Sequence, residues 1–277
     1  MLKSKLNKLK NILQNMKSIL LAYSGGVDST FLLKIAKETI GDNVLAVTAK
    51  SETYPEREYK QAKKIAQKLK VKHMIINTNE LSNPHFIVNP LNRCYYCKKE
   101  LFTKLQQIAS EKGINYIVDG TNCDDDNDFR PGTYAIRELG VRSPLKEAGL
   151  TKKEIRLLSC KMHLPTWNKP PFACLASRLP YGDKITLQKL KMINKAEDYM
   201  YNLGFKQVRV RHYDCTKQNN NIIARIEVCS KDIKRLTSIN LRNKIVSKLK
   251  KIGYRYITLD LQGYRTGSMN PAHFEQS

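Results

Sequence analysis

The segment Ser24-Gly25-Gly26-Val27-Asp28-Ser29 carries residue types that can bind a phosphate. It lies between apolar runs at residues 19–22 and 31–36, a pattern that predicts a buried strand, a tight turn and a helix. The glycines let the backbone approach an anion, the serines can donate hydroxyl protons, and the first amides of the helix face the same point. A Walker-type loop needs a lysine in this turn, whereas this chain has Asp28, which indicates a bound Mg²⁺.

A second polar turn follows a predicted strand at 115–119. Four carboxylates lie between Asp119 and Asp126, although the chain has a formal charge of +24. This concentration favours a magnesium or ribose contact; an Asx-rich turn stabilised by its own side chains is the alternative. Thr48 follows another predicted strand and could line an adenosine pocket, because parallel strands place ligands at their carboxyl ends. The candidate nucleotide contacts are Ser24, Gly25, Gly26, Asp28, Ser29, Thr48, Gly120, Thr121, Asp124 and Asp125.

Two cysteines with Cys-x-x-Cys spacing, Cys94 and Cys97, could bind one metal centre, and Cys174 could supply a third thiolate. Arg178 gives Cys174 a positively charged setting that favours a reactive thiol. The odd total of seven cysteines argues against a disulfide framework. The alternatives are a thiol or persulfide relay, a redox disulfide, two cysteines at a helix start without a special role, and a zinc site with His163 or Cys123 as fourth ligand.

Arginines near the C-terminus could bind a substrate phosphate. Arg209 and Arg211 have the period-two spacing that places both side chains on one face of a strand, and Arg265 lies in a Gly-Tyr-Arg turn. A guanidinium fork fits a phosphate, although a charged outer face of the strand is the alternative. Ser268 could join these arginines, and Glu197 and Glu227 could bind a divalent ion.

The elements that must position these residues alternate in the first half of the chain. Predicted strands at 18–23, 43–48, 71–76 and 115–119 and helices at 28–40, 55–70 and 98–112 indicate an α/β fold with a doubly wound parallel sheet. A proline-rich segment then predicts a loop and hinge, and a helix at 186–203, strands at 206–212, 222–228 and 254–259 and a helix near 239–252 follow it. We expect a nucleotide-binding domain at 1–165, a catalytic loop and hinge at 166–184 and a small α/β domain at 185–277.

The SGGxDS turn resembles the PP-loop of ATP pyrophosphatases, which cleave ATP between the α and β phosphates and adenylate an oxygen. The match extends along nearly the whole chain, and the sequence is similar to the LarE family of sulfur transferases. The resemblance implies an enzyme that uses Mg²⁺ and ATP to adenylate a carboxylate of pyridinium-3,5-biscarboxylic acid mononucleotide and converts it to a thiocarboxylate for the nickel-pincer nucleotide cofactor. The matching segments are SGGVDS at 24–29, RCYYCK at 93–98, GTNCDD at 120–125, ACLASR at 173–178 and GYRTGS at 263–268.

The resemblance implies two routes for the sulfur. In one branch of the family the cysteine that matches Cys174 gives up its own sulfur and becomes dehydroalanine; in the other, three cysteines hold a 4Fe-4S cluster that carries an extra sulfide. The sacrificial branch is not expected to carry the Cys-x-x-Cys pair, so Cys94 and Cys97 favour the cluster. Cys174, Arg178 and Asp28 would be the catalytic residues. The family also implies a homo-oligomer and a sulfide or other sulfur donor as partner.

The excess of Lys and Arg, 49 against 25 acidic residues, favours polyanionic ligands, although solvated lysine faces are the commoner cause. A PP-loop tRNA thiolase is therefore the second hypothesis, against which stands the lack of a recognisable RNA-binding module. A nucleotide-binding or cluster-carrying module without catalysis is the third. No apolar run has membrane-spanning length, no signal peptide is evident, and residues 3–17 form an amphipathic helical pattern, so we expect a soluble, cytoplasmic protein.

Overall fold

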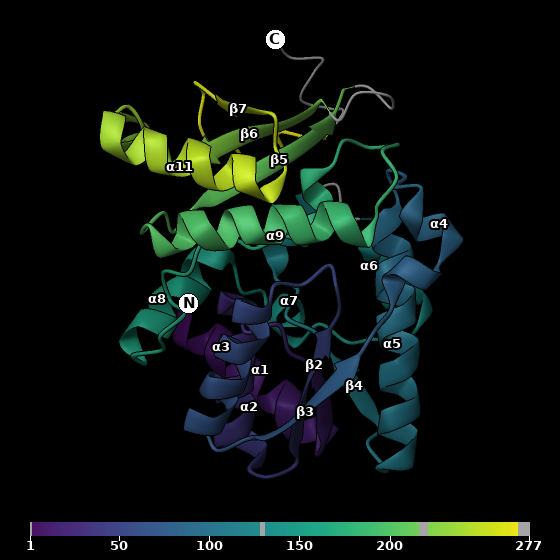
Figure 1. Ribbon diagram of the computed structural model, residues 1–277. Coiled ribbons are helices and arrows are strands. Elements are labelled where there is room, and N and C mark those ends of the chain that lie inside the picture. Colours follow the sequence, from purple (N-terminus) through teal and green to yellow (C-terminus); the bar gives the residue numbers. More distant parts are fainter. Residues whose placement is uncertain (1, 128–130, 216–220, 271–277) are drawn as a thin grey trace. The chain divides into compact units, whose positions relative to one another are not determined.

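The computed structural model describes residues 2–127, 131–215 and 221–270 (Figure 1). The chain divides into two compact units. Unit 1 comprises residues 1–86 and 91–172, and unit 2 comprises residues 87–90 and 173–277. The chain passes from unit 1 to unit 2 for the last time between Phe172 and Ala173, within the segment predicted to be a loop and hinge.

Unit 1 contains a four-stranded parallel sheet in the order β3-β2-β1-β4, which confirms the predicted fold class. Strand residues alternate between its two faces. Ile19 and Leu21 belong to the core formed with α1, α2, α3 and α8, whereas Leu20 packs with Phe102 and Leu105 of α5 (Figure 1). The strands are β1 (Ile19–Ala22), β2 (Val44–Lys50), β3 (Lys72–Asn77) and β4 (Tyr116–Val118), and the longer helices are α1 (Leu2–Met16), α2 (Val27–Ile40), α3 (Glu56–Lys68), α5 (Arg93–Glu111) and α8 (Lys152–Lys161).

Shorter elements connect these strands and helices. The amphipathic helix predicted at the N-terminus is α1, which buries Leu9, Leu13 and Met16 along one stripe and packs against α2 in the core of unit 1. The remaining elements are η1 (Glu80–Ser82), α4 (Pro84–Ile87), η2 (Cys123–Asn127), α6 (Gly132–Glu138) and α7 (Pro144–Glu147).

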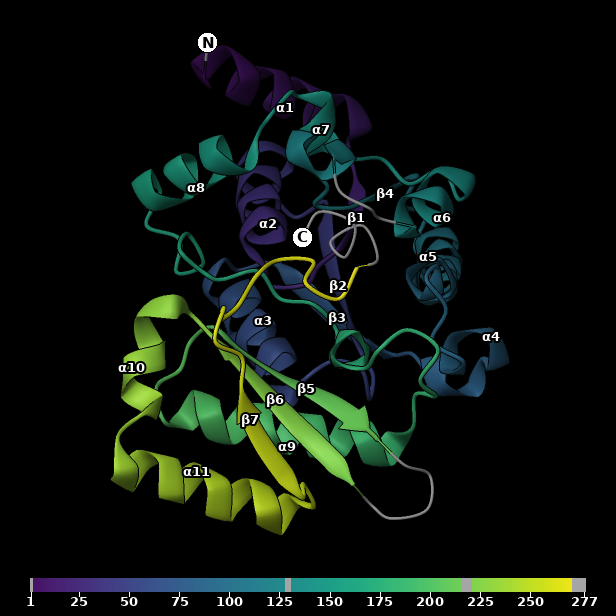
Figure 2. The same ribbon diagram turned by 90° about the horizontal axis from the view of Figure 1, so that it is seen from above.

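Unit 2 contains a three-stranded sheet in the order β5-β6-β7, in which β5 and β6 are antiparallel and β6 and β7 are parallel. Helices α9 and α11 pack along this sheet (Figure 2), where Met200 and Leu249 meet Val210 in the core. The side chains of Arg209 and Arg211 alternate with these core residues. The elements are η3 (Leu175–Arg178), α9 (Leu187–Asn202), β5 (Val208–Asp214), β6 (Ile222–Val228), η4 (Ser230–Asp232), α10 (Ile233–Leu236), α11 (Ile239–Ile252) and β7 (Tyr256–Leu259).

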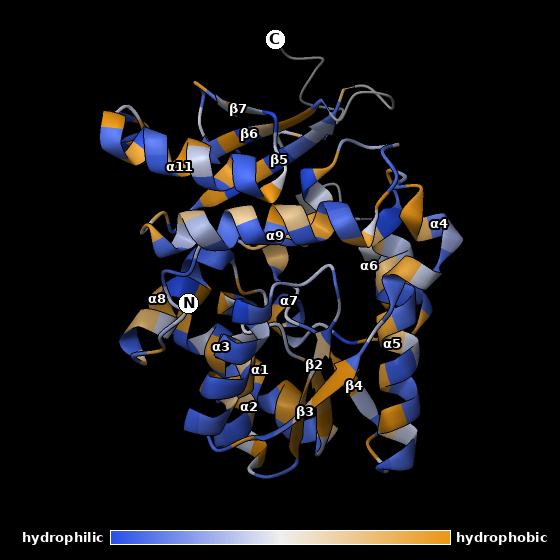
Figure 3. Cartoon of the chain, in the orientation of Figure 1, coloured by the Kyte–Doolittle hydropathy of each residue, from blue (hydrophilic) through white to orange (hydrophobic). Residues whose placement is uncertain are grey.

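Hydropathy follows this layering. The strands of unit 1 are largely apolar, whereas α3, α5, α9 and α11 alternate hydrophilic and apolar residues (Figure 3). Among the residues with described positions, no helix combines the length and apolar character that a membrane span requires.

Candidate functional site

The turn between β1 and α2 has the geometry of an anion cradle. Gly25 has φ +65°, and a Cβ at this position would lie 2.8 Å from the Cβ of Ala62, so only glycine fits. The hydroxyls of Ser24 and Ser29 lie 3.0 Å apart. In the described part of the chain no side chain caps the N-terminus of α2 at Gly26. The first amides of this helix are therefore available to a phosphate, as the sequence predicts.

The turn that follows β4 meets this cradle directly. A Cβ on Gly120 would lie 3.0 Å from the backbone nitrogen of Ser29, so the two turns touch through their backbones. Asp119 accepts hydrogen bonds from the hydroxyls of Thr121 and Ser143, and Asp125 accepts one from the Asn122 amide at 2.9 Å. These bonds are those of the Asx-rich turn considered as the alternative; direct nucleotide contacts by Thr121, Asp124 and Asp125 stay predictions. The side chain of Asp126 lies outside the described residues.

Asp28 is half-buried, and its two carboxylate oxygens differ. Oδ2 forms an ion pair with the ammonium of Lys152, whereas Oδ1 is buried and has no hydrogen-bond partner within the described residues. A buried carboxylate oxygen without a partner is costly unless a ligand satisfies it. The cradle and this oxygen together fit a magnesium-bound nucleotide phosphate.

Thr48 is buried in the sheet. Its hydroxyl donates to the carbonyl of Tyr23 at 2.7 Å and lies 2.8 Å from Nε2 of His73. Burial of the His73 ring lowers its pKa, and the positive charge of Lys63 lowers it further. The hydroxyl therefore already has partners inside the fold, and an adenosine contact by Thr48 stays a prediction.

Lys169, which sequence reasoning missed, ties the end of unit 1 to the cradle. Its ammonium donates to the carbonyl of Gly25 at 3.0 Å and lies 2.8 Å from the carboxylate of Glu58 on α3. The hydroxyl of Tyr54 donates to the carbonyl of Ser24 at 2.7 Å, and the Tyr54 ring meets the ring of Phe172 edge-on at 5.4 Å. The segment that leads to the Cys174 loop is thus attached to the backbone of the phosphate turn.

Cys94 lies in the first turn of α5 and Cys97 at the start of the second turn; the helix begins five residues earlier than the predicted helix at 98–112. Cys94 is exposed and Cys97 is half-buried, with its thiol 3.9 Å from Oε1 of Glu80. Burial raises the pKa of the Glu80 carboxyl. A helix N-terminus stabilises a thiolate, and the role of the pair as two ligands of one metal centre stays a prediction.

The other metal predictions involve residues of both units. Within residues 2–127, 131–215 and 221–270, no three His, Cys, Asp or Glu side chains are grouped closely enough to hold a metal ion. Cys94, Cys97, Cys123 and His163 belong to unit 1 and Cys174 belongs to unit 2. The thiol of Cys123 donates to the Lys146 carbonyl at 3.6 Å. The cluster and zinc assignments both stay predictions.

The loop that carries Cys174 is held from its backbone. The Cys174 carbonyl accepts hydrogen bonds from the Ser177 hydroxyl at 2.8 Å and from Nη1 of Arg178 at 2.9 Å, and Arg178 also donates to the Ala173 carbonyl. Arg178 is fully buried and forms a two-bond ion pair with Glu197, at 2.8 and 2.9 Å. These contacts make Arg178 a positioning residue for the loop; contact with substrate stays a prediction.

Glu197 is also fully buried. Burial alone would raise its pKa, but the charge and hydrogen bonds of Arg178 outweigh burial, so the pKa is lowered. Its Oε1 also accepts the backbone N–H of Val210 on β5 at 3.0 Å. A divalent ion at Glu197 would have to displace these bonds, and the ion role of Glu197 and Glu227 stays a prediction.

Arg209 and Arg211 lie on one face of β5, as their spacing predicts. Arg211 forms a two-bond ion pair with Glu227, at 2.9 and 2.7 Å, and donates to the Ser177 carbonyl and the Ser268 hydroxyl. Burial lowers the pKa of Arg209 to about 10, with a further contribution from the positive charge of Arg178. Arg265 is exposed. Glu227 also pairs with Arg225 at 3.0 Å, so two guanidinium groups share this carboxylate.

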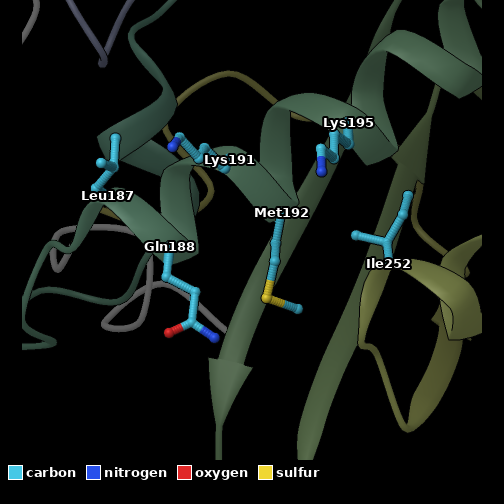
Figure 4. Close-up of a pocket in the computed structure, with 6 residues that line it drawn as sticks. All are labelled: Leu187, Gln188, Lys191, Met192, Lys195 and Ile252. Atoms are coloured by element: carbon cyan, nitrogen blue, oxygen red, sulfur yellow. The ribbon is translucent and has the colours of Figure 1, made fainter.

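A cavity of about 560 Å³ lies away from these residues, beside α9 and α11 (Figure 4). Lys191 and Lys195 project from α9 above Met192, and none of the predicted site residues lines this cavity. Its lining residues are Leu187, Gln188, Lys191, Met192, Lys195 and Ile252.

Comparisons with known proteins agree with this geometry. The family model described as NAD synthase matches residues 1–86. An uncharacterized protein of Synechocystis sp. is 43% identical over 270 residues, covering 98% of both chains. The GMP synthase of Aeropyrum pernix is 28% identical over 64% of this chain and 38% of its own. The pyridinium-3,5-bisthiocarboxylic acid mononucleotide synthase of Lactiplantibacillus plantarum is 37% identical over 93% of this chain and 91% of its own. With that identity over nearly its whole length, the chain belongs to the LarE family of ATP-dependent sulfur transferases in the PP-loop superfamily.

Proposed function

We propose that this enzyme adenylates a carboxylate of pyridinium-3,5-biscarboxylic acid mononucleotide and converts it to a thiocarboxylate, as a step in making the nickel-pincer nucleotide cofactor. The observation that carries the proposal is the identity to the Lactiplantibacillus plantarum synthase over 93% of the chain. The cradle at Ser24–Ser29 supports the ATP-dependent half of the reaction, because its glycines, hydroxyls and free helix amides suit a triphosphate.

The first half-reaction activates an oxygen. A substrate carboxylate oxygen attacks the α-phosphorus of ATP, the bond between that phosphorus and the bridging oxygen breaks, and pyrophosphate leaves. The hydroxyls of Ser24 and Ser29 and the first amides of α2 would hold the phosphates, and Oδ1 of Asp28 would bind Mg²⁺. Adenylation is needed because an oxide ion is a poor leaving group from a carboxylate and AMP is a good one.

The second half-reaction replaces that oxygen with sulfur. A sulfide attacks the acyl carbon, the carbon–oxygen bond to AMP breaks, and AMP departs with the oxygen, so no electrons are gained or lost. We propose that Cys94, Cys97 and Cys174 would hold a 4Fe-4S cluster, which with only three protein ligands would supply a binding place for sulfide. The exposed and half-buried thiols at the N-terminus of α5 support two of these three ligands.

Unit 2 would bind the substrate phosphate. Arg211 and Arg225 share the carboxylate of Glu227, and Arg225 also lies 3.6 Å from Asp260, so a bound phosphate would compete with these two carboxylates for the guanidinium groups. The Ser268 hydroxyl already contacts Arg211 at 3.1 Å, and Arg209 and Arg265 complete the proposed site. We further propose that the enzyme works in the cytoplasm. We also propose that it is a homo-oligomer, and light scattering can test this oligomeric state.

The decisive experiment measures turnover. The protein would be reconstituted anaerobically with iron and sulfide, supplied with Mg²⁺, ATP and the pyridinium mononucleotide, and assayed for pyrophosphate and thiocarboxylate. The proposal expects a coloured protein that makes several thiocarboxylates per chain, and loss of both properties in Cys94→Ala/Cys97→Ala. Cys160→Ala, which removes an exposed cysteine outside the proposed site, is the matched control.

Two outcomes would overturn parts of this proposal. A colourless protein that stops after one event, with Cys174 converted to dehydroalanine and lighter by one sulfur, would replace the cluster with sacrificial sulfur donation. Pyrophosphate release that depends on tRNA, and not on the pyridinium mononucleotide, would replace the substrate.

A further inference from the structure

Lys152 contacts two acidic residues of the predicted nucleotide site, one through its side chain and the other through its backbone N–H. Its ammonium forms the ion pair with Oδ2 of Asp28, 124 residues away in sequence. Its backbone N–H donates to Oδ2 of Asp124 at 2.8 Å. Lys152 therefore links the phosphate turn to the acidic turn after β4, all within unit 1.

The position of this lysine is electrostatically unfavourable by itself. Lys152 is the first residue of α8, where the helix dipole disfavours a cation. The ion pair with Asp28 offsets this cost, because the side chains of Asp28 and Lys152 are only 20% and 35% exposed. The neighbouring Lys153 is exposed. The carboxylate of Asp28 therefore stabilises the Lys152 side chain in its position against the phosphate turn.

The backbone of Lys152 is fixed while its side chain can rotate. Thr151 and Glu154 form a reciprocal capping box at the start of α8, with hydrogen bonds of 2.9 and 3.3 Å. The bond from the Lys152 amide to Asp124 adds a further restraint. A change of partner by the ammonium therefore needs only side-chain rotation, with no movement of α8.

We propose that Lys152 is an exchangeable counter-ion of the nucleotide site. In the nucleotide-free protein its ammonium neutralises Asp28; when magnesium nucleotide binds, the metal ion takes Asp28 and the ammonium moves to a phosphate oxygen. The proposal rests on the proposed function only in taking Mg²⁺ and ATP as the ligands of this turn. The buried, unpartnered Oδ1 of Asp28 supports it, because that oxygen is left for an ion even while Lys152 holds Oδ2.

This exchange predicts opposite effects on two binding equilibria. A divalent ion alone must compete with the ammonium for Asp28, so removal of the ammonium should strengthen metal binding. Magnesium nucleotide gains a phosphate contact from the same ammonium, so its removal should weaken nucleotide binding. A lysine that only stabilised the fold would weaken both.

The test uses Lys152→Met, with Lys153→Met as the matched control from the next position of the same helix. Mn²⁺ binding to the nucleotide-free protein is measured by electron paramagnetic resonance, and ATP binding in excess Mg²⁺ by calorimetry. We expect Lys152→Met to lower the Kd of Mn²⁺ about fivefold and raise the Kd of ATP about tenfold. Lys153→Met should leave both constants unchanged, and Asp28→Asn should abolish the Mn²⁺ site.

Unchanged constants in Lys152→Met, or weaker binding of both ligands, would overturn the proposal. Lys152→Arg, which keeps the charge, guards against simple misfolding: it should keep Mn²⁺ binding near that of the unaltered protein. Both measurements are made without the pyridinium mononucleotide. A protein that shows the opposite shifts but makes no thiocarboxylate would overturn the proposed function and leave this inference standing.

Discussion

Arg178 and Glu197 form an ion pair that is wholly excluded from solvent, with nitrogen–oxygen distances of 2.8 and 2.9 Å. The pair joins the loop of Cys174 to α9, and Glu197 extends the link to the Val210 amide on β5. A buried ion pair is weak evidence of net stability, but removal of one partner leaves an isolated buried charge. The main effect of this pair is therefore to fix the backbone that carries Cys174.

Arg178→Met should both destabilise unit 2 and slow the reaction. The loss of one partner from a buried pair costs about 3–5 kcal/mol. Because the loop also loses the guanidinium bonds to the Ala173 and Cys174 carbonyls, thiocarboxylate formation should slow by about 100-fold. Urea unfolding and hydrogen exchange at the Val210 amide measure stability, and product formation measures the rate.

Arg142→Met is the control for this substitution, because Arg142 forms its two-bond pair with Glu147 at the surface. We expect a loss of less than about 1 kcal/mol there. A fast reaction in Arg178→Met, with the loop intact by hydrogen exchange, would show that the pair does not position Cys174.

Lys169→Met should weaken ATP binding. The substitution leaves the Gly25 carbonyl without its lysine donor and the buried carboxylate of Glu58 without its ammonium. Loss of such contacts costs about 1–3 kcal/mol, so we expect the Kd of ATP to rise about tenfold. Calorimetry measures this change, and Lys161→Met, at an exposed position of α8, is the control. If Lys169→Met and Lys161→Met bind ATP equally well, Lys169 does not support the phosphate turn.

Much of unit 1 could be predicted from sequence because the signals are local. The apolar run at 19–22 and the helical period that follows it both reflect burial against the same sheet, and they locate β1, α2 and the turn between them. The start of α5 was predicted too late, since Arg93-Cys94-Tyr95-Tyr96-Cys97 has no apolar period. A helix start at the cysteine pair was therefore only one of the alternatives that the sequence left open, and the structure has it.

The site residues that sequence reasoning missed are lysines with distant partners. Lys152 lies 124 residues from Asp28 and Lys169 lies 144 residues from Gly25, and in a chain with 49 Lys and Arg no local pattern distinguishes them. Arg178 shows the opposite difficulty. A charged residue in a proline-rich loop is expected at the surface. The complete burial of Arg178 depends on its ion pair with Glu197, which lies on α9, a helix that follows the loop in the sequence.

Gly120→Ala should disrupt the phosphate turn. The new Cβ would lie 3.0 Å from the Ser29 backbone nitrogen, and neither backbone can yield without moving the start of α2. We expect the Kd of ATP to rise at least about tenfold. Gly41→Ala is the control: it also strains the backbone, with φ +63°, but its Cβ would meet open space away from the turn. Equal ATP affinities in the two variants would show that the turns do not pack as described.

The stability of unit 2 should fall as the pH drops below about 6.5, because of His212. This imidazole is buried against Tyr254, with Nδ1 3.3 Å from its hydroxyl, and burial, aided by the charge of Lys189, lowers the His212 pKa from 6.5 to about 4. Between these values the unfolded chain binds a proton that the folded chain does not. Stability from this group is therefore complete above pH 6.5 and falls by about 3 kcal/mol as the pH drops to 4.

The measurement is urea unfolding at several pH values between 6.5 and 5, where carboxylates contribute less than they do below pH 4.5. His212→Gln should remove most of the slope, since an amide keeps a polar group near Tyr254 but does not titrate. The lowered pKa of His73 and the raised pKa of Glu80 both belong to unit 1 and act with opposite signs, so neither should replace the lost slope of unit 2. An unchanged slope in His212→Gln would mean that this imidazole is protonated in the folded protein, and that Tyr254 and Asp214 stabilise its charge.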